Sequence, residues 1–259
     1  MDRPTEKRKR LLEASPYSAP DPDRFTFGGR AFEPDEIVET LGPYITDERA
    51  ARIEQVLSGR TFGIATVVEG LVNLGNVSAV MRSAEALGCQ RFHVITGGST
   101  FKNSARTSLG AEKWLDVYRW HAPAECADYL REEGYRIVVT HVDEKSVPID
   151  VVDFSTRTAL VFGNERDGVS GEMLELADER IVIPMAGFVE SFNISVAAAV
   201  TLYHALRDRQ ARRGRTGDLT SVELCELRAA TYLRSVRSAR AILEDAARRR
   251  RPDSARSDV

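Results

Sequence analysis

Apolar residues between positions 61 and 185 follow two alternating patterns, short β-type runs and longer helical stripes. Several β-type runs are continuously apolar, such as Ile137-Val138-Val139 and Leu160-Val161-Phe162, which is typical of strands covered on both faces. The predicted strands are residues 61–68, 91–96, 115–120, 136–142, 159–162 and 180–183, and the predicted helices are residues 77–87, 124–133 and 171–177. This alternation predicts an α/β domain with a mainly parallel sheet and helices on both faces.

The N-terminal flank lacks such periodicity. Residues 1–45 combine the run Lys7-Arg8-Lys9-Arg10 with many prolines and glycines, so we expect a basic and flexible arm. After it, Asp47 is a candidate N-cap for a short helix that ends near Gly59.

The C-terminal flank is helical in pattern. Residues 194–213 begin as an almost wholly apolar helix and become rich in arginine. Thr220 and Glu223 then have the spacing of a capping box, which predicts another helix that reaches about Ala247. The predicted organisation is an arm at 1–45, a central domain at 46–213 and a basic helical C-terminal extension at 214–259.

Composition places the chain among ordinary globular proteins, because 42% of its 259 residues are apolar and 29% are charged. The net charge of −3 is unevenly distributed: residues 1–10 carry +3, residues 205–259 carry +6, and the body between them carries −12. Basic ends on an acidic body suit a partner with a phosphate backbone, although solvated tails would have the same composition.

Cysteine and histidine usage argues against several kinds of site. The cysteines Cys89, Cys126 and Cys225 are odd in number and far apart, and the four histidines lack zinc-binding spacing, so we expect neither disulfides nor a metal. Neither a membrane-spanning run nor a signal peptide is recognisable. We therefore expect a soluble protein of the cytoplasm.

The first segment that could carry chemistry follows the first predicted strand. Asn76 is a candidate N-cap, and an apolar stripe begins at Val77. At about 100° per residue Arg82 lies about 140° around the helix from Val77, so its guanidinium should point away from the core. A solvent-facing arginine on an amphipathic helix is the simpler explanation of this pattern.

Two further segments follow predicted strands. Residues 160–170 run from a buried strand into a charged turn that contains Glu165, at the sheet edge where open α/β sheets bind ligands. In the other segment Ser191, Asn193 and Ser195 alternate with apolar residues ahead of the apolar helix. One cap needs one such residue, so three favour polar groups presented to a ligand. The glycine-rich signatures of dinucleotide and P-loop sites are absent from the sequence.

Taken together, the three segments resemble the motifs of the SpoU branch of the SPOUT RNA 2′-O-methyltransferases. They read N-x-x-x-x-x-R at 76–82, F-G-N-E-x-x-G at 162–168 and I-P-M-x-G-x-x-x-S-x-N-x-S at 183–195. Residues 108–115 and the basic C-terminal helices are most similar to the TrmH subgroup, the tRNA guanosine-18 2′-O-methyltransferases. The resemblance implies a deep trefoil knot at about 159–205, an exception to the rule that chains avoid threading.

The resemblance also implies a cofactor, partners and site residues. S-adenosylmethionine would bind at the knot, largely through backbone groups, the enzyme would act as a homodimer, and its substrate would be RNA, with tRNA favoured. The matching cofactor positions are Thr140, His141, Gly163, Ile183, Met185 and Ile194. The matching catalytic positions are Asn76, Arg82, Glu165, Ser191 and Asn193, with Arg82 completing a site near the partner's knot.

A physical role for Arg82 follows from the reaction. A ribose 2′-hydroxyl is a poor nucleophile, so it must be held in line with the methyl group while its developing negative charge is stabilised. A guanidinium is a poor free base but a good ligand for ribose and phosphate oxygens. Two alternatives stay open: an rRNA 2′-O-methyltransferase of the same family, and a non-catalytic RNA-binding module with the same fold.

Overall fold

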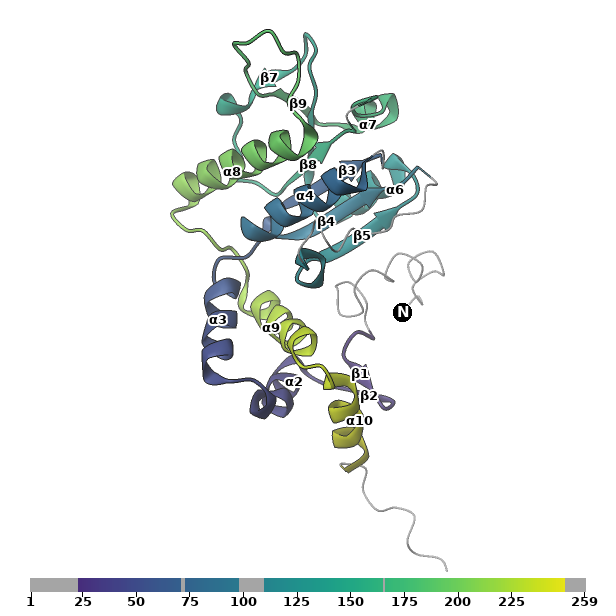
Figure 1. Cartoon of the computed structure of the whole chain (residues 1–259), viewed down its shortest axis with the longest axis vertical. Helices are drawn as coiled ribbons and strands as arrows, with labels where there is room; N and C mark the ends of the chain where they lie inside the picture. Colours follow the sequence, from purple (N-terminus) through teal and green to yellow (C-terminus); the bar gives the residue numbers. More distant parts are fainter. Residues whose placement is uncertain (1–22, 71–72, 98–109, 165, 250–259) are drawn as a thin grey trace, which may run out of the picture. The chain divides into compact units, whose positions relative to one another are not determined.

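The computed structural model describes residues 23–70, 73–97, 110–164 and 166–249. These residues form two compact units, each with its own hydrophobic core (Figure 1). The first unit lies within Gly59–Asp218, and the second combines parts of Pro16–Ser58 and Leu219–Val259. The units therefore divide at 58/59 and 218/219, whereas the sequence patterns placed the boundaries at 45/46 and 213/214.

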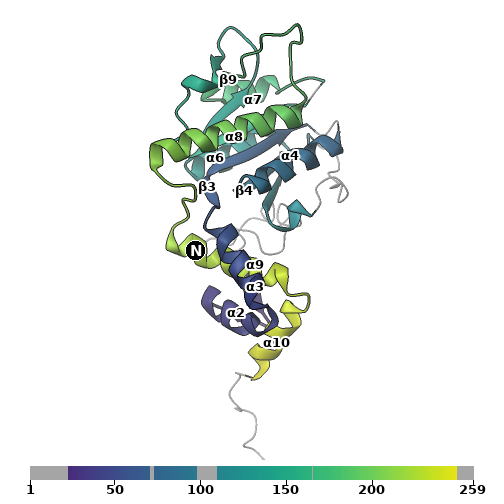
Figure 2. The same cartoon turned by 60° about the vertical axis from the view of Figure 1, so that its left-hand side comes forward.

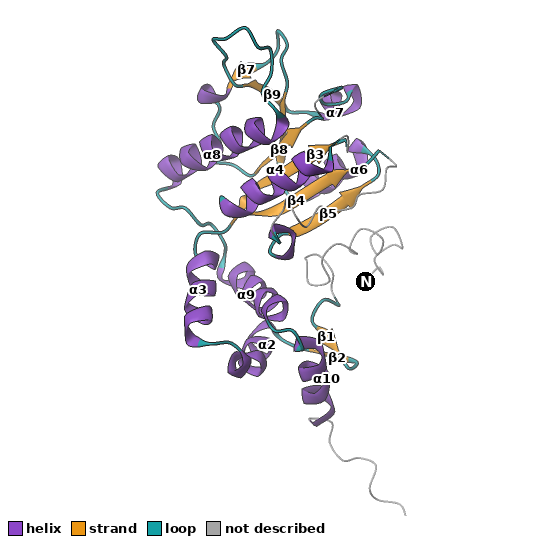
Figure 3. Ribbon diagram, in the orientation of Figure 1, coloured by secondary structure: helices purple, strands orange, loops and turns teal. Residues whose placement is uncertain are grey.

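A seven-stranded sheet forms the centre of the first unit (Figure 3). Its strand order is β5-β4-β3-β8-β6-β9-β7, and every pairing is parallel. The strands are β3 (Thr61–Glu69), β4 (Cys89–Ile95), β5 (Asp116–Trp120), β6 (Arg136–Thr140), β7 (Val147–Pro148), β8 (Thr158–Phe162) and β9 (Glu179–Val182). The predicted parallel α/β sheet is thus confirmed; β7 is too short to leave a periodic signal.

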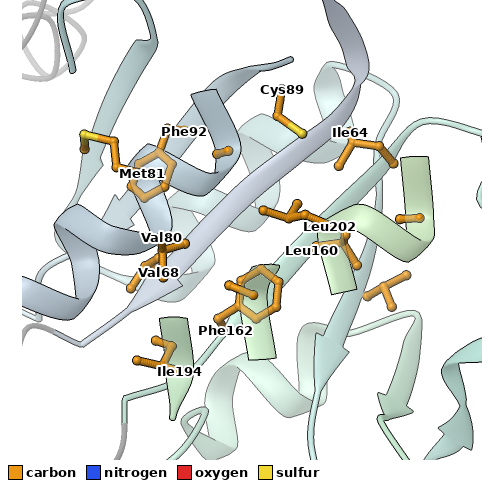
Figure 4. Packing of buried hydrophobic residues seen from close by; sticks show 14 of the residues in the cluster. Ile64, Val68, Val80, Met81, Cys89, Phe92, Leu160, Phe162, Ile194 and Leu202 are labelled. Carbon is orange, nitrogen blue, oxygen red and sulfur yellow. The ribbon is translucent and has the colours of Figure 1, made fainter. Parts of the chain in front are cut away.

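Helices cover both faces of this sheet, as the patterns predicted. On one face α4 (Leu74–Ala86) and α8 (Ile194–Arg213) pack side by side (Figure 2). Their apolar side chains meet Val68, Leu160 and Phe162 of the strands in one core cluster (Figure 4). The other face is covered by α6 (Pro123–Glu132) and α7 (Gly171–Leu176). Two short 3-10 helices, η3 (Ala111–Lys113) and η4 (Ile149–Val151), complete the described helices of this unit.

Near its C-terminal end, α8 is fastened to the sheet by a buried guanidinium. Arg209 is only 3% exposed and donates to the carbonyl oxygens of residues 154, 155 and 156. It also lies 2.5 Å from a carboxylate oxygen of Asp218, which accepts in addition from the amide of Phe62 in β3. A Cβ at Gly63 would lie 2.1 Å from Arg209 Nη2, so β3 has a glycine where the guanidinium passes. The arginine-rich end of α8 is therefore only partly exposed.

The second unit corrects the expectation of an irregular arm at 1–45. Residues 23–45 form a hairpin, β1 (Thr26–Phe27) and β2 (Arg30–Ala31), then α2 (Pro34–Leu41) and η2 (Gly42–Tyr44). Phe27, Phe32 and Ile37 are buried in the core of this unit. The prolines and glycines that suggested disorder have local roles instead: Gly28 and Gly29 adopt positive φ in the hairpin turn, and Pro34 opens a helix. The rest of the predicted arm, residues 1–22, lies outside the described residues.

Three more helices complete the described part of the second unit: α3 (Asp47–Leu57), α9 (Ser221–Ser235) and α10 (Ala239–Arg249). The N-cap of α3 is Thr46, one residue before the predicted Asp47. The predicted capping box of Thr220 and Glu223 is confirmed. The single helix expected to Ala247 is interrupted, however, because Val236 is extended and packs against the core of the unit.

The Arg209–Asp218 pair gives a test of stability. We expect Asp218→Ala to lower the free energy of unfolding by about 3 kcal/mol, because the substitution leaves a buried cation without its carboxylate. Arg212→Ala on the same helix breaks only half-exposed ion pairs and should cost less than about 1 kcal/mol. Urea denaturation followed by circular dichroism measures both losses, and equal losses would contradict the buried-anchor role.

Candidate functional site

Three loops that follow parallel strands meet at one edge of the sheet. These loops are residues 141–146 after β6, 163–170 after β8 and 183–193 after β9. The Thr140 hydroxyl donates to the carbonyl oxygen of Val161 at 3.0 Å, and the His141 amide donates to that of Ile181 at 3.0 Å. The ends of β6, β8 and β9 are therefore tied together, and two predicted cofactor residues, Thr140 and His141, lie where they join.

The loop after β8 is closed on itself. Asn164 and Gly168 exchange backbone hydrogen bonds of 3.1 and 3.0 Å, and the Asn164 side-chain oxygen accepts from the amides of residues 166 and 167. A Cβ at Gly163 would lie 2.1 Å from the Gly168 carbonyl carbon, so this turn accepts only glycine. Gly163 is thereby placed at the sheet edge as predicted. Glu165 lies outside the described residues.

The loop after β6 is shaped by a carboxylate that the sequence patterns did not single out. Asp143 accepts hydrogen bonds from the Ser146 hydroxyl, the Arg180 guanidinium and the amide of Lys145. These hydrogen bonds lower the pKa of Asp143 from 3.8 to about 2, and the bond from Ser146 has the largest effect. Ser146 also donates to the carbonyl oxygen of His141, so the network fixes the predicted cofactor loop. The available signal was an aspartate three residues beyond a strand end, a common turn residue.

The segment between β9 and α8 places its predicted residues in different environments. Ile183 and Met185 are half-buried, while Ile194 is buried and lies near Phe162 (Figure 4). Asn193 is the N-cap of α8: its side-chain oxygen accepts from the amide and the hydroxyl of Ser195 at 2.9 and 2.6 Å. Ser191 is exposed. The simpler capping role therefore accounts for Asn193 and Ser195 within one chain, whereas Ser191 is free to face a ligand.

Helix α4 carries the predicted arginine. Its buried residues include the predicted stripe at Val77, Val80 and Met81, and Arg82 is exposed outside that stripe. The N-cap, however, is Asn73, and the predicted cap Asn76 lies in the first turn. Asn73 takes this role because its side-chain oxygen accepts from the Gly75 amide at 2.9 Å. Within the described part of one chain, no hydrogen bond joins Arg82 to Ser191 or Asn193.

Apolar side chains are also exposed next to the site. Phe192 and three residues of α8 at helical spacing form what we call the apolar strip: Phe192, Val196, Val200 and Tyr203. The opposite face of α8 is buried through Ala198, Leu202 and other residues. A helix that is apolar on both its buried and its exposed face is unusual in a surface position, because an exposed helical face is normally polar.

The arrangement suits a nucleotide-like cofactor better than a metal. Three loops offer backbone donors and acceptors, and the half-buried Ile183 and Met185 offer apolar contacts to a planar group. Over the ranges that the structure describes, no group of three or more histidine, cysteine, aspartate or glutamate side chains is placed to hold a metal ion. No helix in those ranges is long and apolar enough to cross a membrane.

Comparisons with known proteins agree with the motif resemblance. A tRNA (guanosine(18)-2'-O)-methyltransferase of Borreliella burgdorferi is 35% identical over 175 residues, 66% of this chain and 80% of that protein. The crystal structure of the A. aeolicus TrmH/SpoU tRNA modifying enzyme superposes with a TM-score of 0.67 at 30% identity, covering 73% of this chain and 98% of that one. The SpoU methyltransferase AviRb from Streptomyces viridochromogenes, solved with AdoMet, gives a TM-score of 0.51 at 29% identity, covering 60% and 61% of the two chains. The model of the SpoU rRNA Methylase family matches residues 63–203, more than half of the sequence, and the chain belongs to this family.

Proposed function

We propose that this chain is an S-adenosylmethionine-dependent RNA 2′-O-ribose methyltransferase that acts on guanosine 18 of tRNA. The observation that carries the proposal is the meeting of two motif-bearing loops, after β8 and β9, with the predicted cofactor residues Thr140 and His141 at the carboxyl ends of β6, β8 and β9. The relatives named as acting on tRNA support the substrate, and we propose the cytoplasm as the place where the enzyme would meet it.

The cofactor would be held by the loops themselves. S-adenosylmethionine supplies a methyl group on a sulfonium sulfur, a good leaving group. Thr140, His141 and Gly163 present backbone atoms at the joined strand ends, while Ile183, Met185 and Ile194 supply apolar surface. Because the strands are buried on both faces, these backbone atoms are held nearly rigid before any ligand binds.

Arg82 would act on the RNA side of the reaction. In the transfer the 2′-oxygen would bond to the methyl carbon as the carbon–sulfur bond breaks, and the hydroxyl proton would pass to a phosphate oxygen or to Arg82. The Arg82 guanidinium binds the ribose and its phosphate and stabilises the developing alkoxide. Asn76 and Asn193 orient these groups, Ser191 hydrogen-bonds the ribose, and Glu165 steadies the loop after β8. The proposal requires no metal ion.

A homodimer would complete the site. The apolar strip on α8 offers a self-complementary surface, and its burial would cover Phe192, which immediately precedes the predicted catalytic Asn193. Arg82 is exposed, and among the described residues no hydrogen bond joins it to Ser191 or Asn193, so we propose that it serves the loops of a second copy.

We also propose that residues 159–205 form the trefoil knot. Strand β9 pairs with β6 on one side and with β7 on the other. Since β6 and β7 are consecutive strands that come earlier in the sequence, the chain inserts β9 between two strands that precede it. The knot lies in the predicted 46–213 domain, and the basic residues of the 214–259 extension and of the N-terminal run would contact tRNA phosphates.

The reaction can be tested directly. Purified protein is incubated with labelled S-adenosylmethionine and a tRNA transcript, and the product is mapped by alkaline-resistant cleavage. We expect one 2′-O-methyl group, at guanosine 18. Methylation of an rRNA transcript alone would support the alternative substrate, and cofactor and RNA binding without transfer would support a non-catalytic module.

The role of Arg82 predicts a separation of binding from turnover. Arg82→Ala should lower kcat by at least about 100-fold, because a transition-state donor is lost, while the Kd for S-adenosylmethionine measured by calorimetry stays unchanged. Arg82→Lys should recover only part of the activity, since an ammonium lacks the bidentate fork. Arg131→Ala, the same change on α6, serves as control. Normal turnover of Arg82→Ala would refute the assignment.

The apolar strip predicts the oligomeric state. Val200→Glu should weaken self-association at least tenfold, because a two-fold contact would bury the new charge twice. Val222→Glu makes the same change at an exposed valine of α9, outside the strip, and should leave the dimer intact. Sedimentation velocity measures both variants. A wild-type monomer at micromolar concentration would contradict the proposed dimer.

A further inference from the structure

Glu69 is a buried carboxylate to which the motifs assign no role. It is the last residue of β3, pairs with Ile95 of β4 and is only 7% exposed. On the other side of β3, Val68 pairs with Phe162, so Glu69 lies level with Gly163, the first residue after β8. A carboxylate at the end of an otherwise apolar strand costs free energy unless its oxygens are bound.

The hydrogen bond of Glu69 reaches the far end of the loop after β8. Its Oε2 accepts from the backbone amide of Ser170 at 2.9 Å, a charge-assisted bond between residues 101 positions apart. Burial, and after it the charge of Glu69, raises the pKa of the Cys126 thiol on α6. Cys126 is therefore a neutral neighbour, and it adds no second negative charge beside the carboxylate.

Two contacts lie between the described part of the loop after β8, residues 163–164 and 166–170, and the end of β3. The Asn164–Gly168 bridge closes the loop internally, as described above. At the near end Gly70 passes so close to Asn164 that a Cβ would lie 2.6 Å from the Asn164 side-chain nitrogen. At the far end the Glu69–Ser170 bond holds the last residue of the loop. The Glu69–Ser170 bond is therefore the hydrogen bond by which the end of β3 holds the far end of this loop.

We propose that Glu69 is a positioning residue for cofactor binding. It holds the loop after β8 at the carboxyl end of β3 through its bond to Ser170. Glu69 acts through the loop and not by contact with the reacting atoms. The inference rests on the proposed function, because it concerns the same cofactor site.

The test compares two substitutions of Glu69 with a matched control. Glu69→Ala removes the acceptor, and the Kd for S-adenosylmethionine measured by calorimetry should rise at least tenfold. Glu69→Gln keeps an oxygen of the same reach and should bind within threefold of the wild type. The control is Asp178→Ala, because Asp178 accepts from the amide of Ile137 at 2.6 Å at the opposite end of the sheet. This control should lower Tm and leave the Kd unchanged.

A second pair of variants tests the bond from the donor side, should Glu69→Ala fail to fold. Ser170 has φ −63°, which a proline ring accepts, so Ser170→Pro removes the amide hydrogen with little backbone change. Ser170→Ala keeps the amide and loses only the hydroxyl that caps α7. We expect the proline variant to bind S-adenosylmethionine at least tenfold more weakly than the alanine variant.

Two results would overturn the inference. One is an unchanged cofactor Kd in folded Glu69→Ala or an equal Kd in the two Ser170 variants. The other is a Glu69→Gln variant as weak as Glu69→Ala, since charge and not position would then matter. Wild-type protein that binds no S-adenosylmethionine in the same titration would instead overturn the proposed function, so the two failures are distinguishable.

Discussion

The pairing of β8 with both β3 and β6 is the constraint on which the site depends. Because all three strands run in parallel, their carboxyl ends reach the same edge, and the loops that follow them must meet there. The register is fixed by burial on both faces, since a slip of one residue would exchange the two buried faces of β8. The position of Gly163 is therefore set by the packing of the sheet core and not by the loop alone.

Polar anchors hold the two ends of the same sheet for different purposes. At the amino end the buried Arg209 binds three carbonyl oxygens and Asp218. At the carboxyl end Asp143 and Asn164 use their side chains to shape loops whose other atoms stay accessible. The amino-end anchor stabilises the fold, while the carboxyl-end anchors leave a rigid but open edge. A buried cation is costly unless its hydrogen bonds and its carboxylate partner are in place, and the contacts of Arg209 meet both needs.

Periodicity explains which parts of this structure could be predicted. The strands and the apolar stripe of α4 leave regular spacings, and these predicted the sheet, both helical layers and the exposure of Arg82. Local sequence signals gave wrong predictions where contacts between residues far apart in the sequence determine the structure. Pro34 and Gly28 suggested an arm because their partners, such as the core around Leu227, lie about 200 residues away in sequence. The burial of Arg209 likewise depends on the carbonyl oxygens of residues 154–156 and on a glycine in β3, which no short window around Arg209 contains.

In the described part of one chain Arg82 is exposed, and the chemistry proposed needs drier surroundings. An exposed guanidinium is surrounded by water, where its attraction for a developing alkoxide is weak, and a positioned donor needs a dry site to act strongly. The side-chain oxygen of Asn193 already caps α8, and Ser191 is exposed. Burial of the apolar strip against a second copy would remove water beside these residues. In the proposed dimer the same contact would supply the hydrophobic driving force for association and the low-dielectric surroundings that the reaction requires, so assembly and catalysis would depend on one surface.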